Sequence, residues 1–185
     1  AVTAKVSLSD GFKGGVTLQE SIALLGMLEQ DGTLDAVQLS GGSSLMNPMY
    51  LFRGDVPASE FADSMPAPVR WGMKTPVGRS FLKSYPFEEG YFRDKALEVR
   101  AATSIPLMLL GGINRLDTMQ QAMADGFEYV AMGRAVLREP DLVNRLAAGQ
   151  ATQGVCIHCN RCMPTIYDGT RCPIREPQPL HLAKR

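Results

Sequence analysis

The sequence predicts an α/β fold in which four strand–helix units form one parallel sheet, equivalent to half of a (β/α)8 barrel. Short apolar segments at 2–8, 36–40, 107–110 and 129–132 have the length and composition of strands. Helical patterns alternate with them, and strands that alternate with helices pair in parallel. A full barrel needs about 250 residues, so four units need roughly half that length.

The first strand–helix unit shows the alternation most clearly. Apolar side chains at every second position of 2–8 share one face of a strand. Thr17 and Glu20 form a capping box, in which each side chain satisfies a free backbone N–H at a helix start. The helix is expected to end near Asp31 and Gly32.

Glycine and proline mark the ends of the later helices. The helix after the third strand is expected to close at Gly126. Pro140 suits the first turn of a last helix, and Gly149 suits the C-terminal end of that helix. The chain starts directly with a strand-like segment, which leads us to expect further sequence before it.

We predict two domains. Residues 1–149 form the half-barrel, with an insert at about 41–90 that is too irregular for one plain helix. Residues 150–185 form a cysteine-rich tail. The insert carries Trp71 and follows a barrel strand, so it is a candidate lid over a substrate.

Composition excludes several function classes. The 19 basic and 19 acidic residues cancel, so nothing indicates binding to nucleic acid or to an anionic membrane. No apolar run is long enough to span a bilayer. The four cysteines all lie between Cys156 and Cys172, which favours a reduced compartment and a metal site over a disulfide scaffold. We therefore expect a cytoplasmic protein.

Glycine-containing turns after two successive strands predict a phosphate site. Gly111 and Gly112 follow the third strand, and Gly133 and Arg134 follow the fourth. Glycines let a phosphate approach backbone N–H groups, and arginine adds charge-assisted hydrogen bonds. The alternative is that these glycines only close turns.

The tail carries the spacing C-x2-C-x2-C-x9-C, and its ligands would be Cys156, Cys159, Cys162 and Cys172. Three thiolates at such short intervals can hold one corner of an iron–sulfur cluster, with the fourth closing the site. Zinc, or a motif that has lost its metal, are the alternatives. His158 lies between two cysteines, and a solvated side chain is the expectation for it, with an auxiliary metal ligand as the alternative. His181 carries little information.

These segments together resemble the Old Yellow Enzyme family. The resemblance rests on residues 5–10, 109–113, 130–134 and 138–142, in the order of the family's last four barrel strands. It implies an FMN-dependent NAD(P)H oxidoreductase on a (β/α)8 barrel, of which this chain is the C-terminal half. The cysteine segment resembles the dienoyl-CoA reductase and trimethylamine dehydrogenase branch, where a [4Fe–4S] cluster passes electrons to FMN.

The resemblance also implies roles for individual residues. Lys5 matches the basic residue that faces the flavin pyrimidine edge, where a cation stabilises anionic reduced flavin. The family more often has arginine there, and the alternative for Lys5 is a solvated side chain. The remaining implied flavin contacts are the end of the second strand and the phosphate loops: Ser40, Gly41, Gly42, Gly111, Gly112, Gly133 and Arg134.

The implied activity is hydride transfer from NAD(P)H through FMN to an unsaturated carbonyl-type substrate. The family's substrate-anchoring histidine pair and proton-donating tyrosine belong to the first half of the barrel, so the catalytic residues are expected outside this chain. Its expected partner is that missing half-barrel, and a homo-oligomer stays open. Two other functions are weighed: a non-catalytic phosphate-binding half-barrel and a small iron–sulfur electron-transfer module.

Overall fold

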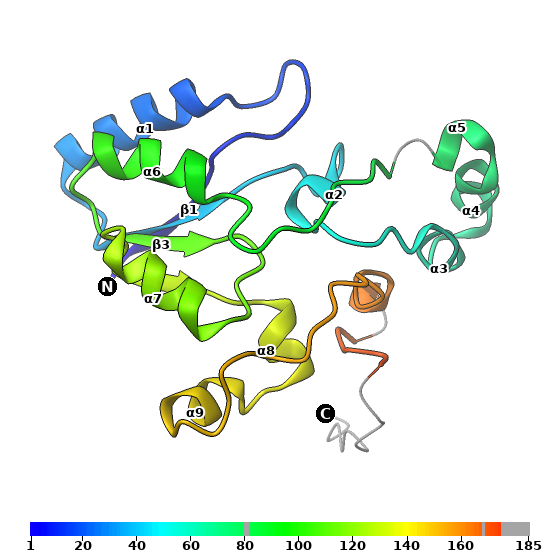
Figure 1. Cartoon of the computed structure of the whole chain (residues 1–185). Helices are drawn as coiled ribbons and strands as arrows, with labels where there is room; N and C mark the ends of the chain where they lie inside the picture. The colour runs from blue at the N-terminus through cyan, green and yellow to red at the C-terminus, as the bar shows by residue number, and fades with distance from the viewer. Residues whose placement is uncertain (80–81, 168, 175–185) are drawn as a thin grey trace, which may run out of the picture.

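The computed structural model describes residues 1–79, 82–167 and 169–174. Four strands, β1 (Thr3–Ser7), β2 (Ala36–Ser40), β3 (Leu107–Leu110) and β4 (Tyr129–Ala131), form one sheet in the order β1-β2-β3-β4 (Figure 1). Every neighbouring pair is parallel. The predicted strands, their order and their direction are confirmed.

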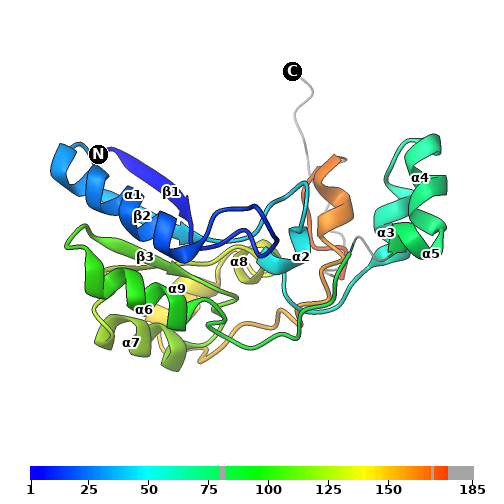
Figure 2. The ribbon, with the colours of Figure 1, turned by 90° about the horizontal axis from the view of Figure 1, so that it is seen from above.

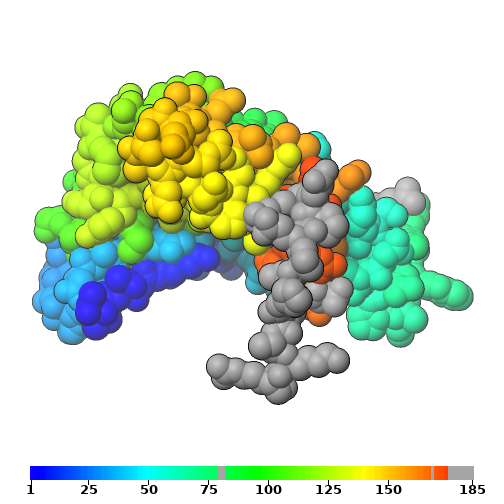
Figure 3. Space-filling model, turned by 90° about the horizontal axis from the view of Figure 1, so that it is seen from below, coloured from blue at the N-terminus to red at the C-terminus, as the bar shows by residue number. Residues whose placement is uncertain are grey.

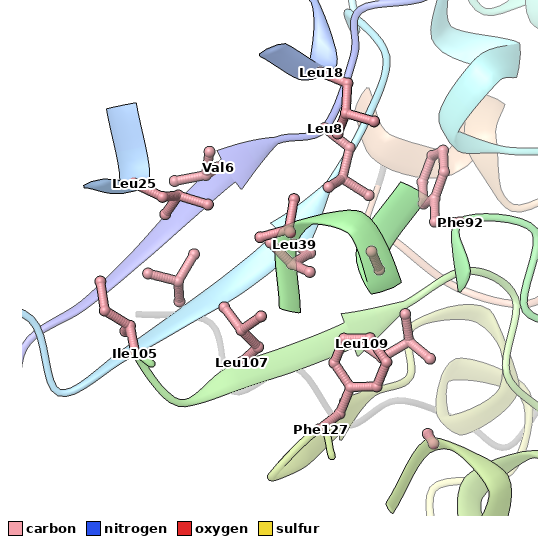
Figure 4. Packing of buried hydrophobic residues seen from close by; sticks show 14 of the residues in the cluster. Val6, Leu8, Leu18, Leu25, Leu39, Phe92, Ile105, Leu107, Leu109 and Phe127 are labelled. Carbon is pink, nitrogen blue, oxygen red and sulfur yellow. The ribbon is translucent and has the colours of Figure 1, made fainter. Parts of the chain in front are cut away.

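Three helices pack along one face of the sheet: α1 (Leu18–Asp31), α6 (Arg93–Ala102) and α7 (Leu116–Ala124) (Figure 2). One cluster of buried apolar side chains joins the strands to these helices (Figure 4). Burial of this apolar surface is the main stabilising contribution to the half-barrel. The largest fully buried members from strands, helices and loops include Leu8, Leu25, Leu39, Phe92, Val99, Leu107, Leu109 and Phe127.

Helix α1 begins and ends as its sequence predicts. The backbone N–H of Glu20 donates to Thr17 Oγ1 at 3.3 Å, and Glu20 Oε2 accepts from the N–H of Thr17 at 2.8 Å. The helix ends at Gly32, whose left-handed backbone lets its N–H bond carbonyls of the last turn.

The second face of the sheet carries a row of side chains from all four strands. Lys5 pairs with Gln38, Gln38 with Met108, and Met108 with Tyr129. Residues paired across a parallel ladder share a face, so these four lie in line on the side opposite the helices. In a closed barrel this face is the interior. Lys5 therefore lies in the middle of β1 and faces inward.

The described part of the insert, residues 41–79 and 82–90, contains four short helices: α2 (Pro48–Leu51), α3 (Ala58–Asp63), α4 (Ala67–Lys74) and α5 (Pro76–Arg79). Helices α3 to α5 form a lobe away from the first strand (Figure 3). Trp71 on α4 is 81% exposed. The prediction that the insert is not one plain helix is confirmed.

Among the residues described after the sheet, two short helices are followed by a 3-10 helix: α8 (Arg134–Arg138), α9 (Leu142–Ala147) and η1 (Met163–Tyr167). The sequence did not predict α8. The placement of Pro140 in the first helical turn is wrong, because α9 starts at Leu142 with Asp141 as its N-cap. Gly149 follows α9 with a left-handed backbone, as expected.

The C-terminal part of the predicted tail, residues 175–185 with His181, lies outside the described residues. Within the described ranges, no helix has both the length and the apolar character that crossing a membrane would require.

Candidate functional site

A cavity of about 180 Å³ opens where the strands end. It brings together four of the predicted flavin-contacting residues, Lys5, Gly112, Gly133 and Arg134. Tyr91, two residues before α6, and His158 from the cysteine segment complete its polar lining. The carboxyl ends of parallel strands are where α/β folds bind ligands, so this cavity is the candidate cofactor site.

The other four predicted residues do not line this cavity. Ser40 is buried at the end of β2. A side chain at Gly41 would lie 2.6 Å from the ring of Phe92, and one at Gly111 would lie 3.0 Å from the backbone of that residue. These two glycines allow close packing between the strand ends and the start of α6. Gly42 packs in the same way against the insert.

Gly112 has a conformational reason to be glycine. Its φ of +74° is left-handed, and a Cβ there would lie 2.6 Å from the ring of Phe87. Any other residue would be strained and would displace that ring. Both the left-handed turn and the nearby Phe87 ring therefore require glycine at position 112.

Arg134 is held by neutral acceptors at the mouth of the cavity. Its Nη1 donates to the carbonyl of Arg53 at 2.8 Å and to Oδ1 of Asn160. Its guanidinium lies 6.0 Å from the centre of the Phe52 ring. None of the ion pairs in the described ranges involves Arg134. Its charge is thus oriented without being neutralised.

Tyr91 stands between two arginines. Its hydroxyl donates to the carbonyl of Leu51 at 2.5 Å, and the guanidinium of Arg53 lies 4.9 Å from the centre of its ring. Burial raises the pKa of Tyr91, and the charges of Arg134 and Arg53 offset part of that rise. The phenol is neutral at physiological pH.

His158 is not solvated, so that prediction is wrong. Only 8% of its surface is exposed, and its ring stacks on Phe87 with centroids 3.5 Å apart. Burial, and then the charge of Arg134, lowers the pKa of His158 to about 4. No local pattern indicates this placement, because the stacking partner of His158 lies about 70 residues earlier in the chain.

The four cysteines are free and half-buried, and they line one small cavity together with Arg134. Burial raises the pKa of Cys156 and of Cys162. In residues 1–79, 82–167 and 169–174, no group of three or more His, Cys, Asp or Glu side chains has an arrangement suited to a metal ion. The metal site thus stays a prediction, although the four thiols share one cavity.

A larger, mostly apolar cavity of about 700 Å³ adjoins the first. It lies between the insert, α8 and η1, and it shares Phe52, Gly133 and Arg134 with the smaller cavity. Leu45 and Phe61 of the insert form part of its wall. The insert therefore borders the candidate site, as expected for a lid, but Trp71 does not line the cavity.

Known proteins resemble this chain along most of its length. The 4,4'-dithiodibutanoate disulfide reductase of Rhodococcus erythropolis is 54% identical over 176 residues, which cover 95% of this chain. This relative is named as a reductase, which agrees with the oxidoreductase class expected for the chain. The match spans 43% of the Rhodococcus protein.

A structural match and more distant sequence matches agree with the predicted barrel fold. A 2-naphthoyl-CoA reductase in complex with 2-naphthoyl-CoA superposes with a TM-score of 0.53 and 17% identity, covering 79% of this chain and 18% of that chain. The family described as "Histidine biosynthesis protein", a TIM-barrel family, matches residues 88–166. The HisF subunit of imidazole glycerol phosphate synthase from Chlorobium limicola is 33% identical over 64 residues, 35% of this chain and 26% of that protein. The half-barrel fold is confirmed.

Proposed function

We propose that this chain is the flavin-phosphate half of an FMN-dependent NAD(P)H oxidoreductase. The observation that carries the proposal is the cavity where Lys5, Gly112, Gly133 and Arg134 meet. Its relatives by sequence and by fold include proteins named as reductases, which supports redox chemistry. When bound, FMN would accept hydride from the nicotinamide and pass it to the substrate.

The residues of the cavity suit the two ends of FMN. Arg134 offers an unneutralised guanidinium for the phosphate, and a Cβ at Gly133 would meet no atom within 4 Å, so there is room beside it. Lys5 faces the barrel interior and can stabilise negative charge on the reduced ring. One sequence relative is named imidazole glycerol phosphate synthase, and the phosphate ester in that name adds support for the phosphate site.

The adjoining apolar cavity suits the body of an organic substrate. Its position next to Arg134 and Gly133 places it beside the proposed cofactor. The family resemblance favours an unsaturated carbonyl compound. The name of the Rhodococcus relative favours an organic disulfide, which one NAD(P)H and one proton would reduce to two thiols.

The four cysteines are proposed ligands of a [4Fe–4S] cluster, with zinc as the alternative. Four free thiols on a compact segment provide a suitable donor set, and they line a common cavity. The four thiols must lose their protons and move together when the metal binds, because their present positions among the described residues do not form a metal-binding group.

The proposal also covers the missing part of the barrel and the location of the protein. The remaining barrel strands, with the substrate-activating histidines and tyrosine, are proposed to lie elsewhere in a longer chain. We place the protein in the cytoplasm, without nucleic-acid or membrane partners, and leave self-association to measurement. A phosphate-binding half-barrel without activity, or an electron-transfer module using only its cluster, would be the alternatives.

One experiment separates these functions. The full-length protein is purified anaerobically, its flavin is extracted and identified, and NADH or NADPH oxidation is followed with 4,4'-dithiodibutanoate and with cyclohexenone. We expect bound FMN and turnover of at least one substrate. Bound FMN without turnover would favour the binding module, and cluster without flavin would favour the electron-transfer module.

A further inference from the structure

Asn160, in the middle of the cysteine segment, has a buried side chain with every hydrogen-bonding group in use. It is 1% exposed. Its Nδ2 donates to the carbonyls of Phe52 at 2.6 Å and of Asp55 at 2.9 Å, and its Oδ1 accepts from Arg134. This amide has one allowed orientation. A flip would turn its NH2 group toward the Arg134 guanidinium and its oxygen toward the two carbonyl oxygens.

The backbone around Asn160 is shaped to present that amide. Asn160 and His158 both have φ of +56°, a left-handed conformation that asparagine tolerates better than most residues. The carbonyl of His158 accepts from the N–H of Asp55 at 3.2 Å. A Cβ at Gly54 would lie 2.1 Å from that carbonyl oxygen, so the approach of the two segments needs glycine at this position.

The guanidinium of Arg134 is therefore held in place by neutral acceptors. Arg134 Nη1 has two acceptors, the carbonyl of Arg53 and the amide oxygen of Asn160, and neither carries a charge. A carboxylate in either place would compete with an anionic ligand for the guanidinium. Arg134 also lines both the cofactor cavity and the cysteine cavity, so this contact joins the two.

We propose that Asn160 is a positioning residue for the cofactor phosphate: it holds Arg134 in the orientation that binds the phosphate, so that the cysteine segment completes the phosphate site. This inference rests on the proposed FMN site. It differs from that proposal in assigning a role to a side chain of the cysteine segment that needs no bound metal.

Comparison of two flavins tests the inference, because riboflavin has the ring and ribityl chain of FMN but no phosphate. Dissociation constants for both are measured by flavin fluorescence in the full-length protein. The variants are Asn160→Gly, which suits the left-handed backbone, Arg134→Ala, and both together. Circular dichroism and thermal melting establish that each variant folds.

Asn160→Gly is expected to weaken FMN binding by about tenfold, the scale of a lost charge-assisted contact, and riboflavin binding by less than about threefold. Adding it to Arg134→Ala is expected to change FMN binding no further, because residues acting through one contact are not additive. Equal losses for FMN and riboflavin, or unchanged FMN binding, in Asn160→Gly would overturn the inference.

A second variant decides the matter if Asn160→Gly does not fold. Asn160→Asp keeps the shape but sets a negative charge against Arg134, so FMN binding is expected to fall while riboflavin binding holds. Asn144→Asp on the exposed side of α9 is the matched control and is expected to change neither. Unchanged FMN binding in Asn160→Asp overturns the inference.

The two proposals fail in different ways. If Arg134→Ala weakens FMN selectively and neither Asn160 variant does, only the positioning role of Asn160 is overturned. If Arg134→Ala leaves the ratio of FMN to riboflavin affinity unchanged, the phosphate assignment of Arg134 fails, and the role of Asn160 fails with it.

Discussion

His158 and Phe87 stack nearly parallel, with an angle of 13° between their rings. This contact connects the cysteine segment to the end of the insert, beside the cofactor cavity. Gly112 lies under the same Phe87 ring. Two segments that are far apart in sequence therefore share one aromatic contact at the candidate site.

Removing Phe87 should destabilise the protein. Phe87→Ala is expected to lower the free energy of unfolding by about 2 kcal/mol, because a half-buried ring and a stacked pair are lost. Urea denaturation measures the change. Trp71→Ala, which removes an 81% exposed ring on α4, is the control and is expected to change stability by less than about 0.5 kcal/mol. Equal effects of the two substitutions would contradict the packing role of Phe87.

Lys5 should affect flavin reactivity more than flavin affinity. Lys5→Met removes the cation that faces the barrel interior, and we expect reduction of bound FMN by NAD(P)H to slow by about tenfold. Stopped-flow absorbance measures that rate. Lys13→Met, in the exposed loop after β1, should leave it unchanged. An unaltered rate in Lys5→Met would remove Lys5 from the site.

The cysteine motif predicts a defined metal content. Anaerobic purification followed by iron, sulfide and zinc analysis is expected to give four irons and four sulfides per chain. Cys159→Ser should abolish them, and chelation should lower thermal stability, because ligation energy contributes to folding. One zinc per chain without acid-labile sulfide would mean that the cysteine site is structural. Absence of any metal would contradict the metal-site prediction.

The ion pair between Arg93 of α6 and Asp125 at the C-cap of α7 should make the free energy of unfolding depend on pH. Arg93 donates two hydrogen bonds to Asp125, at 2.6 and 2.7 Å, and these bonds lower the pKa of Asp125 below its usual 3.8. A lowered carboxyl pKa contributes stability above pH 3.8 that is lost as the pH falls through the folded value.

Arg93→Gln should therefore destabilise the protein at pH 7 by roughly 0.5–1 kcal/mol, after allowance for solvent screening. Urea midpoints between pH 7 and pH 3 should show the difference shrinking below pH 3.8. Arg115→Gln breaks the exposed pair with Asp117 and serves as the control, with no measurable loss. If the stability difference between the original protein and Arg93→Gln did not change with pH, titration of Asp125 would not be its cause.

Local sequence patterns were sufficient to predict the half-barrel. Strand periodicity and glycine turns located all four strands, and the capping box of Thr17 and Glu20 located the start of α1. These features depend on neighbours in sequence, so a local pattern records them. The family resemblance implied that Lys5 and Arg134 both contact the flavin, and both line one cavity.

The rest of the site depends on contacts between distant segments. His158 lacks any local sign of burial, because its burial comes from Phe87 and the insert. Asn160 likewise acquires its partners from residues 52–55 and from Arg134. Gly41 and Gly111 carry the same local signal as Gly112, yet their role is packing. Only the folded chain separates the two kinds of glycine.

The insert has a consequence for the order of folding. Strands β2 and β3 are neighbours in the sheet, but residues 41–106 lie between them, whereas the other neighbouring strands are joined by shorter connections. Closing a longer loop costs more chain entropy, so contacts across it form late. We expect β1–β2 and β3–β4 to assemble as separate pairs and to dock last along β2 and β3. The cofactor cavity draws on both pairs, with Lys5 from one and Arg134 following the other, so it comes into existence only with that final step.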